Sequence, residues 1–234
     1  MKSFCSSINL IVGVLVVVIV SFGLCKKVSA KDSELTEAEI AEGWVSLFNG
    51  SDLKGWKNNN DRPVKAKIED GAINPHGTGG YLLVYDKRFG DFVFKTDVKM
   101  SGPDCNSGVF LRTGDLANPV YSALEVQVLG GDGTTVHDFG ALYDLVAPSK
   151  NATRGEGEWN TIEARCEGPL VVVSVNGEKV SELNADEWTE PRKRPDGSRH
   201  KFGKAIKDFP REGYIGLQDH GHAVWFKNIK VREL

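Results

Sequence analysis

Apolar and polar residues alternate along much of the chain, as they do in β-strands that bury one face. The pattern is clearest in FVFKTDVKM at 92–100, ALEVQVL at 123–129 and WNTIEARC at 159–166. Because successive side chains of a strand point to opposite faces, each segment predicts a half-buried strand. Further strands are expected at 44–48, 81–85, 108–113, 140–143, 170–175, 214–218 and 223–231.

Turn and cap residues punctuate these strands. Asp70-Gly71 and Asn176-Gly177 are dipeptides that favour two-residue hairpins, and Thr36 with Glu39 forms a capping box that predicts a short helix at 34–42. About ten short strands and one early helix are typical of an all-β fold, an antiparallel β-sandwich or jelly roll.

One long segment, 184–210, lacks this alternation. It is polar, partly basic and interrupted by Pro191, Pro195 and Pro210. Loops of this length in a compact domain are usually functional or disordered, so we expect a surface loop that walls one side of a cleft.

The N-terminal thirty residues have the pattern of a secretory signal peptide. An apolar run at 10–20 follows Lys2, and Val28-Ser29-Ala30 resembles a cleavage site. We expect a signal peptide at 1–30, a single domain at 31–234, and an exported protein, periplasmic, secreted or at the cell surface. The alternative is an uncleaved membrane anchor at 8–24, which is short for a span.

Charge and cysteine content narrow the classes further. The net charge of −3 offers no basic field for nucleic acid. Cys105 and Cys166 remain after the expected cleavage, and they either pair or lie apart as two small buried residues. The chain has no CxxC metal motif.

Several predicted strands pair an apolar face with a face of unusual polarity. Glycines interrupt this polar face and leave room for a ligand, and its Arg, Glu and Gln groups suit vicinal hydroxyls. We therefore predict a carbohydrate cleft on one sheet. Its residues are Asn106 and Arg112 in one strand, Glu125 and Gln127 in the next, Tyr143 beyond them, and Gln218 with His220 near the C-terminus.

Structural roles are the alternatives for three of these positions. Glu125 and Arg112 could form a cross-strand ion pair, and His220 beside Gly221 could be a hydrogen-bonded turn residue. His137 beside Asp138 is a weak metal-ligand candidate because no partner spacing accompanies it.

Six motifs in order carry a family resemblance. They are GWVSLFNGSDLKGW at 43–56, NSGVFLR at 106–112, LEVQV at 124–128, GALY at 140–143, GEWN at 157–160 and GYIGLQDHG at 213–221. Together they resemble the 3-keto-disaccharide hydrolase family over nearly all of the expected mature chain. Two positions depart from its pattern: Leu124 stands where an aromatic residue precedes the glutamate, and 137–139 reads HDF.

The resemblance implies a concanavalin-like jelly roll that cleaves glycosides already oxidised to a ketone at C3. Such a ketone acidifies the C2 hydrogen, so a base can abstract it, the C1–oxygen bond breaks by elimination, and water adds. His220 suits the base, Arg112 the enolate oxygen and Tyr143 the leaving group, while Glu125 orients the histidine or the sugar.

Other readings of the same face stay open. Asn106, Gln127 and Gln218 suit substrate hydroxyls. No cofactor is certain, and a divalent metal held by Glu125 and a histidine would be an alternative stabiliser to Arg112. The second function class is a non-catalytic carbohydrate-binding module, which would need no base at His220.

Export is directly testable. Cleavage after Ala30 should give a mature chain that starts at Lys31, because Val28-Ser29-Ala30 is a small-residue cleavage site of the A-x-A type. Mass spectrometry of the protein from its native host measures this, and a mature chain that retains 10–20 would favour the membrane anchor.

Overall fold

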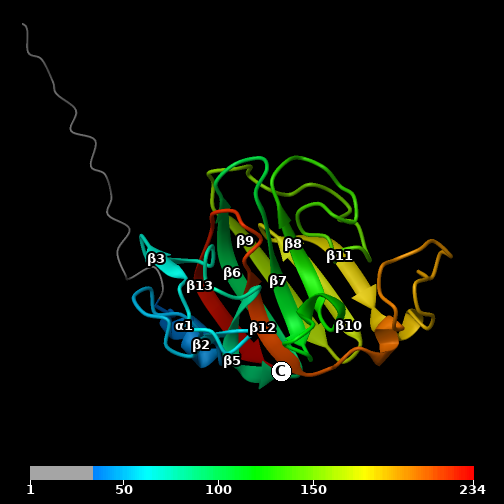
Figure 1. Cartoon of the computed structure of the whole chain (residues 1–234), viewed down its shortest axis with the longest axis horizontal. Helices are drawn as coiled ribbons and strands as arrows, with labels where there is room; N and C mark the ends of the chain where they lie inside the picture. The colour runs from blue at the N-terminus through cyan, green and yellow to red at the C-terminus, as the bar shows by residue number, and fades with distance from the viewer. Residues whose placement is uncertain (1–33) are drawn as a thin grey trace, which may run out of the picture.

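The computed structural model describes residues 34–234, and these form two β-sheets packed face to face (Figure 1). One sheet has eight strands and the other has five, and every strand pair is antiparallel. The elements are α1 (Glu37–Ala41), β1 (Val45–Ser46), β2 (Trp56–Asn58), β3 (Lys67–Glu69), β4 (Ala72–Asn74), β5 (Leu82–Phe89), β6 (Phe92–Met100), β7 (Asn106–Thr113), the 3-10 turn η2 (Pro119–Tyr121), β8 (Leu124–Leu129), β9 (Asn160–Glu167), β10 (Leu170–Val175), β11 (Glu178–Asn184), η3 (Ala185–Glu187), η4 (Ile206–Asp208), β12 (Gly213–Gln218) and β13 (Val224–Glu233).

The strand order brings distant segments together. The larger sheet runs β11-β10-β9-β6-β13-β4-β3, with β1 paired to β13, and the smaller runs β2-β5-β12-β7-β8. In the smaller sheet β12, near the C-terminus, lies between β5 and β7. The predicted all-β antiparallel sandwich with one short N-terminal helix is confirmed.

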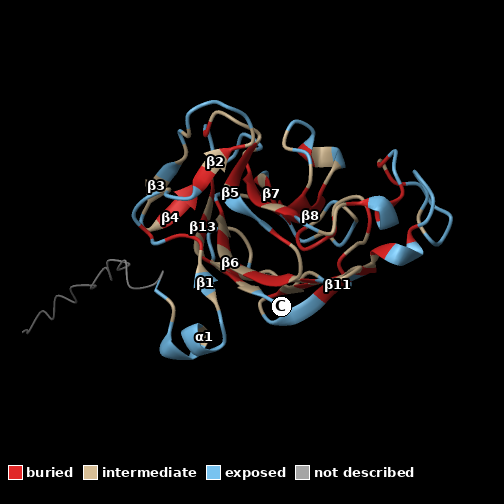
Figure 2. Ribbon diagram, turned by 90° about the horizontal axis from the view of Figure 1, so that it is seen from below, coloured by how far each residue is buried: buried red, intermediate tan, exposed pale blue. Residues whose placement is uncertain are grey.

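The core lies between the two sheets. Figure 2 shows the buried residues concentrated in the strands, while α1 and the connecting loops are mostly exposed. Val109, Val126 and Leu217 point inward from the smaller sheet, and Phe94 and Ile162 point inward from the larger. The alternate positions of β7 and β8 therefore face outward, as the period of two requires.

Local signals are confirmed where they are strongest. Asp70 and Gly71 have φ of 50° and 74°, and they join β3 to β4 in a two-residue turn. Asn176-Gly177 joins β10 to β11 in the same way. The capping box is present: the Glu39 amide donates to the Thr36 side chain, and the Glu39 carboxylate accepts from the Thr36 amide.

The strand predicted at 140–143 is wrong. Gly140 and Asp144 have φ of 82° and 58°, so this segment folds back irregularly along the edge of β8. It is still hydrogen-bonded to β8 through the backbone: the Gln127 N–H donates to the Ala141 carbonyl, and the Tyr143 N–H donates to the Glu125 carbonyl. These bonds hold Tyr143 beside Glu125 without a regular strand.

A β-bulge in β7 changes the face on which Arg112 lies. Phe110 pairs with Gly216 and Thr113 with Tyr214, so Leu111 and Arg112 stand opposite the single Ile215. Arg112 has φ of 52°, the left-handed conformation of a bulge. The strict alternation that predicted Arg112 beside Asn106 therefore breaks at this point.

Arg112 instead ties together the turns at the far end of β7. Its side chain, 3% exposed, donates to the Gly90 carbonyl at 2.8 Å, the Gly168 carbonyl at 2.8 Å and Asp91 Oδ1 at 2.7 Å. The cross-strand pair with Glu125 does not form. Arg112 holds the β5–β6 turn against the β9–β10 turn.

Cys105 and Cys166, the two cysteines within 34–234, lie apart as buried free thiols. Burial raises the pKa of Cys166 to about 12, and Cys105 Sγ contacts Ser101. The expected signal peptide at 1–30 lies outside the described residues and stays a prediction. No helix within 34–234 is long and apolar enough to cross a membrane.

Replacing Arg112 should therefore cost stability. Arg112→Ala leaves two turn carbonyls without donors, so the free energy of unfolding should fall by about 2–4 kcal/mol. Urea denaturation measures it. Arg165→Ala, which removes an exposed pair with Glu167, is the control and should change stability by less than about 0.5 kcal/mol. Equal effects of the two variants would contradict the structural role of Arg112.

Candidate functional site

A polar pocket opens on the outer face of the smaller sheet, away from the core. Six of the seven residues predicted from the sequence line it, and Arg112 is the exception. Its cavity is about 90 Å³, which is small for a ligand pocket. The lining residues are Tyr81, Asn106, Val120, Glu125, Gln127, Tyr143, Lys201, Gln218 and His220.

β7 and β8 supply the floor. Glu125 and Gln127 point outward from β8, and Gly108 on β7 pairs with Gln127. A Cβ on Gly108 would lie 2.4 Å from Glu125 Oε1, so only glycine lets the carboxylate lie across β7. Gln127 Nε2 donates to Asn106 Oδ1 at 3.2 Å, which joins the two polar residues nearest this end of the strands.

Gln218 of β12 connects β8 to the residue before β5 at the bottom of the pocket. Its Nε2 donates to Glu125 Oε1 at 3.2 Å and to the Tyr81 hydroxyl at 2.5 Å. The side-chain oxygens of Gln218 and Gln127 are buried and accept no hydrogen bond within the protein. Unpartnered buried acceptors are costly, so these two amides are ready for donors such as sugar hydroxyls.

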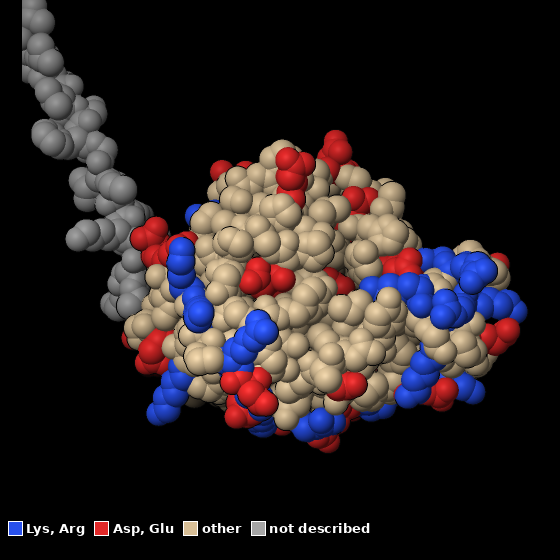
Figure 3. Space-filling model, in the orientation of Figure 1, with Lys and Arg blue, Asp and Glu red and all other residues tan. Residues whose placement is uncertain are grey.

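Lys201 supplies the cation of the pocket, which sequence reasoning missed. It comes from the long loop after β11, over which Lys and Arg side chains gather (Figure 3). Its neighbours His200 and Phe202 are buried, which turns Lys201 toward the pocket. The loop was expected to wall a cleft. Because its residues do not alternate between polar and apolar, the sequence does not distinguish Lys201 from the other basic residues of the loop.

Asp144 fixes the position of Lys201. The Lys201 amide donates to Asp144 Oδ2 at 2.5 Å, and Asp144 directly follows Tyr143. Arg194 secures the same junction, because its Nη2 donates to the Asp144 carbonyl at 2.8 Å and its Nε to the Leu145 carbonyl at 3.1 Å. The loop is thus fastened to the segment that carries Tyr143.

Burial controls the charge of Glu125. Its side chain is almost inaccessible, and burial raises its pKa from 4.5 to about 7, against the opposing effects of Lys201 and Gln218. Burial also lowers the pKa of Lys201, while Glu125 and Asp144 raise it. A carboxyl group with a pKa near neutrality can both accept and donate a proton at working pH.

The two tyrosines of the pocket are neutral hydrogen-bond donors. Burial is the main reason that the pKa of Tyr81 rises to about 12, and the charge of Glu125 is the second reason. The same two causes, in the same order, raise the pKa of Tyr143. Lys201 Nζ lies 4.1 Å from the centroid of the Tyr143 ring. Both hydroxyls therefore keep their protons beside the carboxylate.

His220 lies at the mouth of the pocket and is exposed. The adjacent Asp219 shapes its turn: one carboxylate oxygen accepts from the Gly221 amide at 3.0 Å, and the other accepts from the Gly77 amide at 2.8 Å. His220 can reach a group that enters or leaves the pocket, whereas Glu125 faces a group that is held inside.

The pocket offers few side chains that could bind a metal ion. Glu125 is the one carboxylate that lines the pocket and His220 the one histidine. No three His, Cys, Asp or Glu side chains within 34–234 gather in a way that would hold a metal ion. His137 packs on Tyr143, 4.9 Å between ring centroids, rather than joining such a group.

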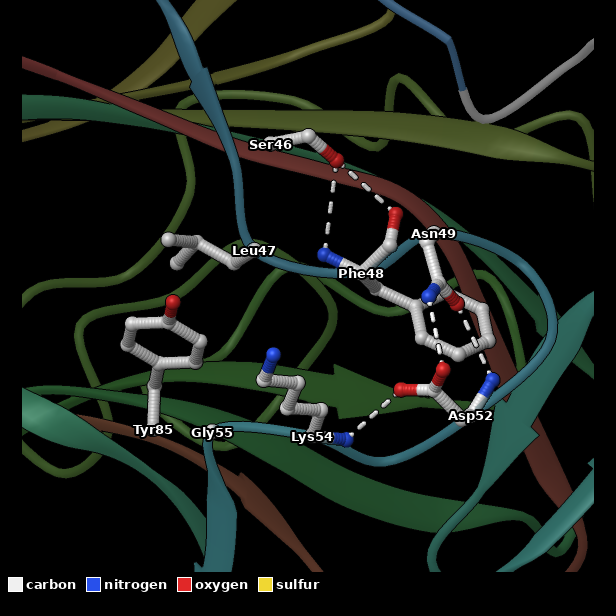
Figure 4. A pocket seen from close by; sticks show the side chains of 8 residues that line it. All are labelled: Ser46, Leu47, Phe48, Asn49, Asp52, Lys54, Gly55 and Tyr85. Carbon is white, nitrogen blue, oxygen red and sulfur yellow. Dashed lines mark hydrogen bonds between the residues drawn. The ribbon is translucent and has the colours of Figure 1, made fainter.

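A second hollow, between the loop after β1 and Tyr85, contrasts with this pocket (Figure 4). Its polar groups satisfy one another: Asn49 Oδ1 accepts from the Asp52 amide at 2.9 Å, and Asn49 Nδ2 donates to Asp52 Oδ2 at 2.9 Å. Asp52 Oδ1 also accepts from the Lys54 amide. This part of the GWVSLFNGSDLKGW motif builds a loop.

Comparisons place the chain among glycoside-acting proteins. The family described as 3-keto-alpha-glucoside-1,2-lyase-like domain matches residues 43–232. The 3-keto-disaccharide hydrolase of Bacteroides thetaiotaomicron is 30% identical over 88% of this chain and 84% of its own. Two Parabacteroides distasonis proteins, provisionally described as glycosyl hydrolases, have similar structures. One is 28% identical over 82% of this chain and 99% of its own, with a TM-score of 0.72. The other is 29% identical over 87% and 99%, with the same TM-score.

Glu125 should make stability depend on pH. Because its folded pKa of about 7 exceeds 4.5, the folded chain binds this proton more tightly than the unfolded chain. The stabilisation is complete below about pH 4.5 and is lost as the pH rises through 7. Between these limits the wild type should lose on the order of 2 kcal/mol more than Glu125→Gln.

Urea denaturation across this pH range measures the difference. Lys201→Met should raise the pKa of Glu125 further, because the carboxylate then lacks the cation that lowers it. The pH-dependent loss of stability should therefore be larger in this variant than in the wild type and should continue to higher pH. Parallel pH curves for the wild type and Glu125→Gln would show that Glu125 titrates as an ordinary carboxyl group.

Proposed function

The chain belongs to the 3-keto-alpha-glucoside-1,2-lyase-like domain family, and from this we propose that it is a hydrolytic enzyme that cleaves 3-keto-disaccharides. The proposal extends to the mechanism: abstraction of the C2 proton, elimination of the C1 substituent and hydration. The polar pocket on the smaller sheet is the site at which this takes place.

The observation that carries the proposal is the isolated Glu125 beside Lys201. Ordinary glycosidases need two opposed carboxyl groups, and here one carboxylate lines the pocket. A single base with a pKa of about 7 and a nearby cation suit proton abstraction α to a ketone. The unpartnered oxygens of Gln127 and Gln218 supply acceptors for sugar hydroxyls.

The reaction requires only the groups that line the pocket and one water molecule. The base takes the C2 proton, and the C2–H electrons form the enolate of the C3 ketone. Re-formation of the ketone expels the C1 oxygen, which takes a proton as it leaves, and a C1–C2 double bond remains. Water then adds its oxygen to C1 and a proton to C2, which gives a 3-keto-monosaccharide and the released sugar.

We assign the base to Glu125 in preference to His220. Glu125 lies at the pocket floor, where a bound ring would be held, while His220 is exposed at the mouth. A histidine at the mouth suits protonation of the departing sugar oxygen. The base role that the sequence suggested for His220 thus becomes a proposed acid role, which the variants below separate.

Lys201 takes the role first expected of Arg112. Its ammonium group lines the pocket with Glu125, so it can stabilise an enolate oxygen that forms next to the base. The neutral hydroxyls of Tyr81 and Tyr143 are additional donors for the same oxygen or for the ring hydroxyls. No step requires a metal ion.

Turnover of a 3-keto-disaccharide and of its unoxidised parent should differ completely. Only the oxidised sugar has an acidic C2 hydrogen, so only it should be cleaved. In D₂O the 3-keto product should carry one deuterium at C2, beyond the exchange seen without enzyme, and mass spectrometry measures it. Cleavage of the unoxidised parent, or product without deuterium, would point to an ordinary glycosidase.

Variants assign the roles. Glu125→Gln and Lys201→Met should each lower kcat by about 10²-fold or more, and Arg112→Lys should leave kcat near wild type. If His220 is the acid, His220→Ala should lose activity on a disaccharide and keep it on a glycoside with a good leaving group. Loss on both substrates would return the base role to His220. If the wild-type protein binds the sugar but cleaves neither substrate, a non-catalytic binding module would be favoured.

A further inference from the structure

We propose that Tyr121 forms a stacking platform, outside the catalytic pocket, for the sugar that leaves from C1. The inference rests on the proposed function and adds a second subsite to it. The cavity of about 90 Å³ is too small for two sugar rings, so the second ring of a disaccharide would lie at the mouth. Tyr121 is the exposed aromatic side chain that borders this mouth.

The position of Tyr121 follows from its neighbours. Val120 lines the pocket, and Tyr121 is the next residue in the short turn η2. Lys201 Nζ lies 5.8 Å from the centroid of the Tyr121 ring and 4.1 Å from that of Tyr143. The catalytic lysine thus lies near both rings, one in the pocket and one beside it.

The exposure of Tyr121 is unusual in this part of the molecule. The residue is 51% exposed, and the other large hydrophobic residues of comparable exposure within 34–234 lie elsewhere, in α1, in β1 and at the C-terminus. Phe202 supports the ring edge-on, at 6.3 Å between centroids. The ring is therefore held on one side and open to solvent on another.

The loop that carries Tyr121 is well braced. Ser122 Oγ donates to the Asp115 carbonyl at 3.0 Å and accepts from the Asp115 amide at 3.1 Å, which closes the loop between β7 and β8. Leu116 packs against the outer face of the sheet, and its carbonyl accepts from Asn59 at 2.9 Å. A ring held this way can bind without a large ordering cost.

A pyranose ring matches this surface. One of its faces carries axial C–H groups that pack on an aromatic ring, while its hydroxyls point outward to water and to hydrogen-bonding neighbours. Lys201 and the exposed His137, which packs on Tyr143, provide such neighbours at the same mouth. The platform selects for a second sugar rather than for a small alkyl group.

The test compares two substrates that differ only in the leaving group. For a 3-keto-disaccharide, Tyr121→Ala should raise KM about tenfold with little change in kcat, because the ring touches no reacting atom. For the methyl glycoside of the same 3-keto sugar, KM should stay within about twofold of wild type. Tyr121→Phe should restore the disaccharide KM, since the ring and not the hydroxyl does the stacking.

Trp44→Ala is the control, because Trp44 is an aromatic side chain beside α1 that packs under Lys230 and Arg232. It should leave both substrates unaffected. An equal effect of Tyr121→Ala on the two substrates, or no effect on the disaccharide, would overturn the platform while leaving the proposed reaction intact. So would a loss in Tyr121→Phe as large as that in Tyr121→Ala.

Binding alone decides the question if the wild type cleaves neither substrate. Calorimetry with the unoxidised disaccharide and its monosaccharide requires no reaction. Tyr121→Ala should weaken binding of the disaccharide by about tenfold and leave the monosaccharide unchanged. Equal weakening of the two, or none, would rule out the platform independently of the enzymatic proposal.

Discussion

The site depends on a carboxylate that is buried on the outside of a sheet. Glu125 projects from β8 away from the sandwich core, yet it is only 8% exposed because loops cover it. An isolated charge in such a place is expensive, and the protein responds in two ways. Burial raises the pKa of Glu125 to about 7, and the Lys201 ammonium and the Gln218 amide partly compensate the charged form.

The loops that bury Glu125 are positioned by separate devices. Asp144 and Arg194 fasten the loop that carries Lys201 to the segment that follows Tyr143. Gly108 leaves the space into which the carboxylate fits. Because the cover, the cation and the floor come from different parts of the chain, the electrostatics of Glu125 depend on the whole outer layer of the smaller sheet.

Unsatisfied polar groups distinguish this pocket from the larger hollow near Tyr85. In that hollow Asn49 and Asp52 bond to each other and to their own loop. In the pocket the oxygens of Gln127 and Gln218 lack partners although both residues are buried. The hollow is the larger of the two, but the unfilled hydrogen-bonding capacity makes the pocket the better candidate for a ligand.

The sequence by itself determined most of the strands, the hairpins and most of the polar face. These features depend on local rules: side chains alternate along a strand, and Asn176-Gly177 adopts its turn without help from elsewhere. Glu125, Gln127 and Gln218 were found this way because β8 and β12 keep their alternation up to these residues. Tertiary structure decided the rest. The bulge at Arg112 depends on pairing with β12, which no pattern within β7 reveals. Lys201 lies in a loop without a regular alternation of polar and apolar residues, and the bonds of this loop to Asp144 and Leu145 bring it to Glu125.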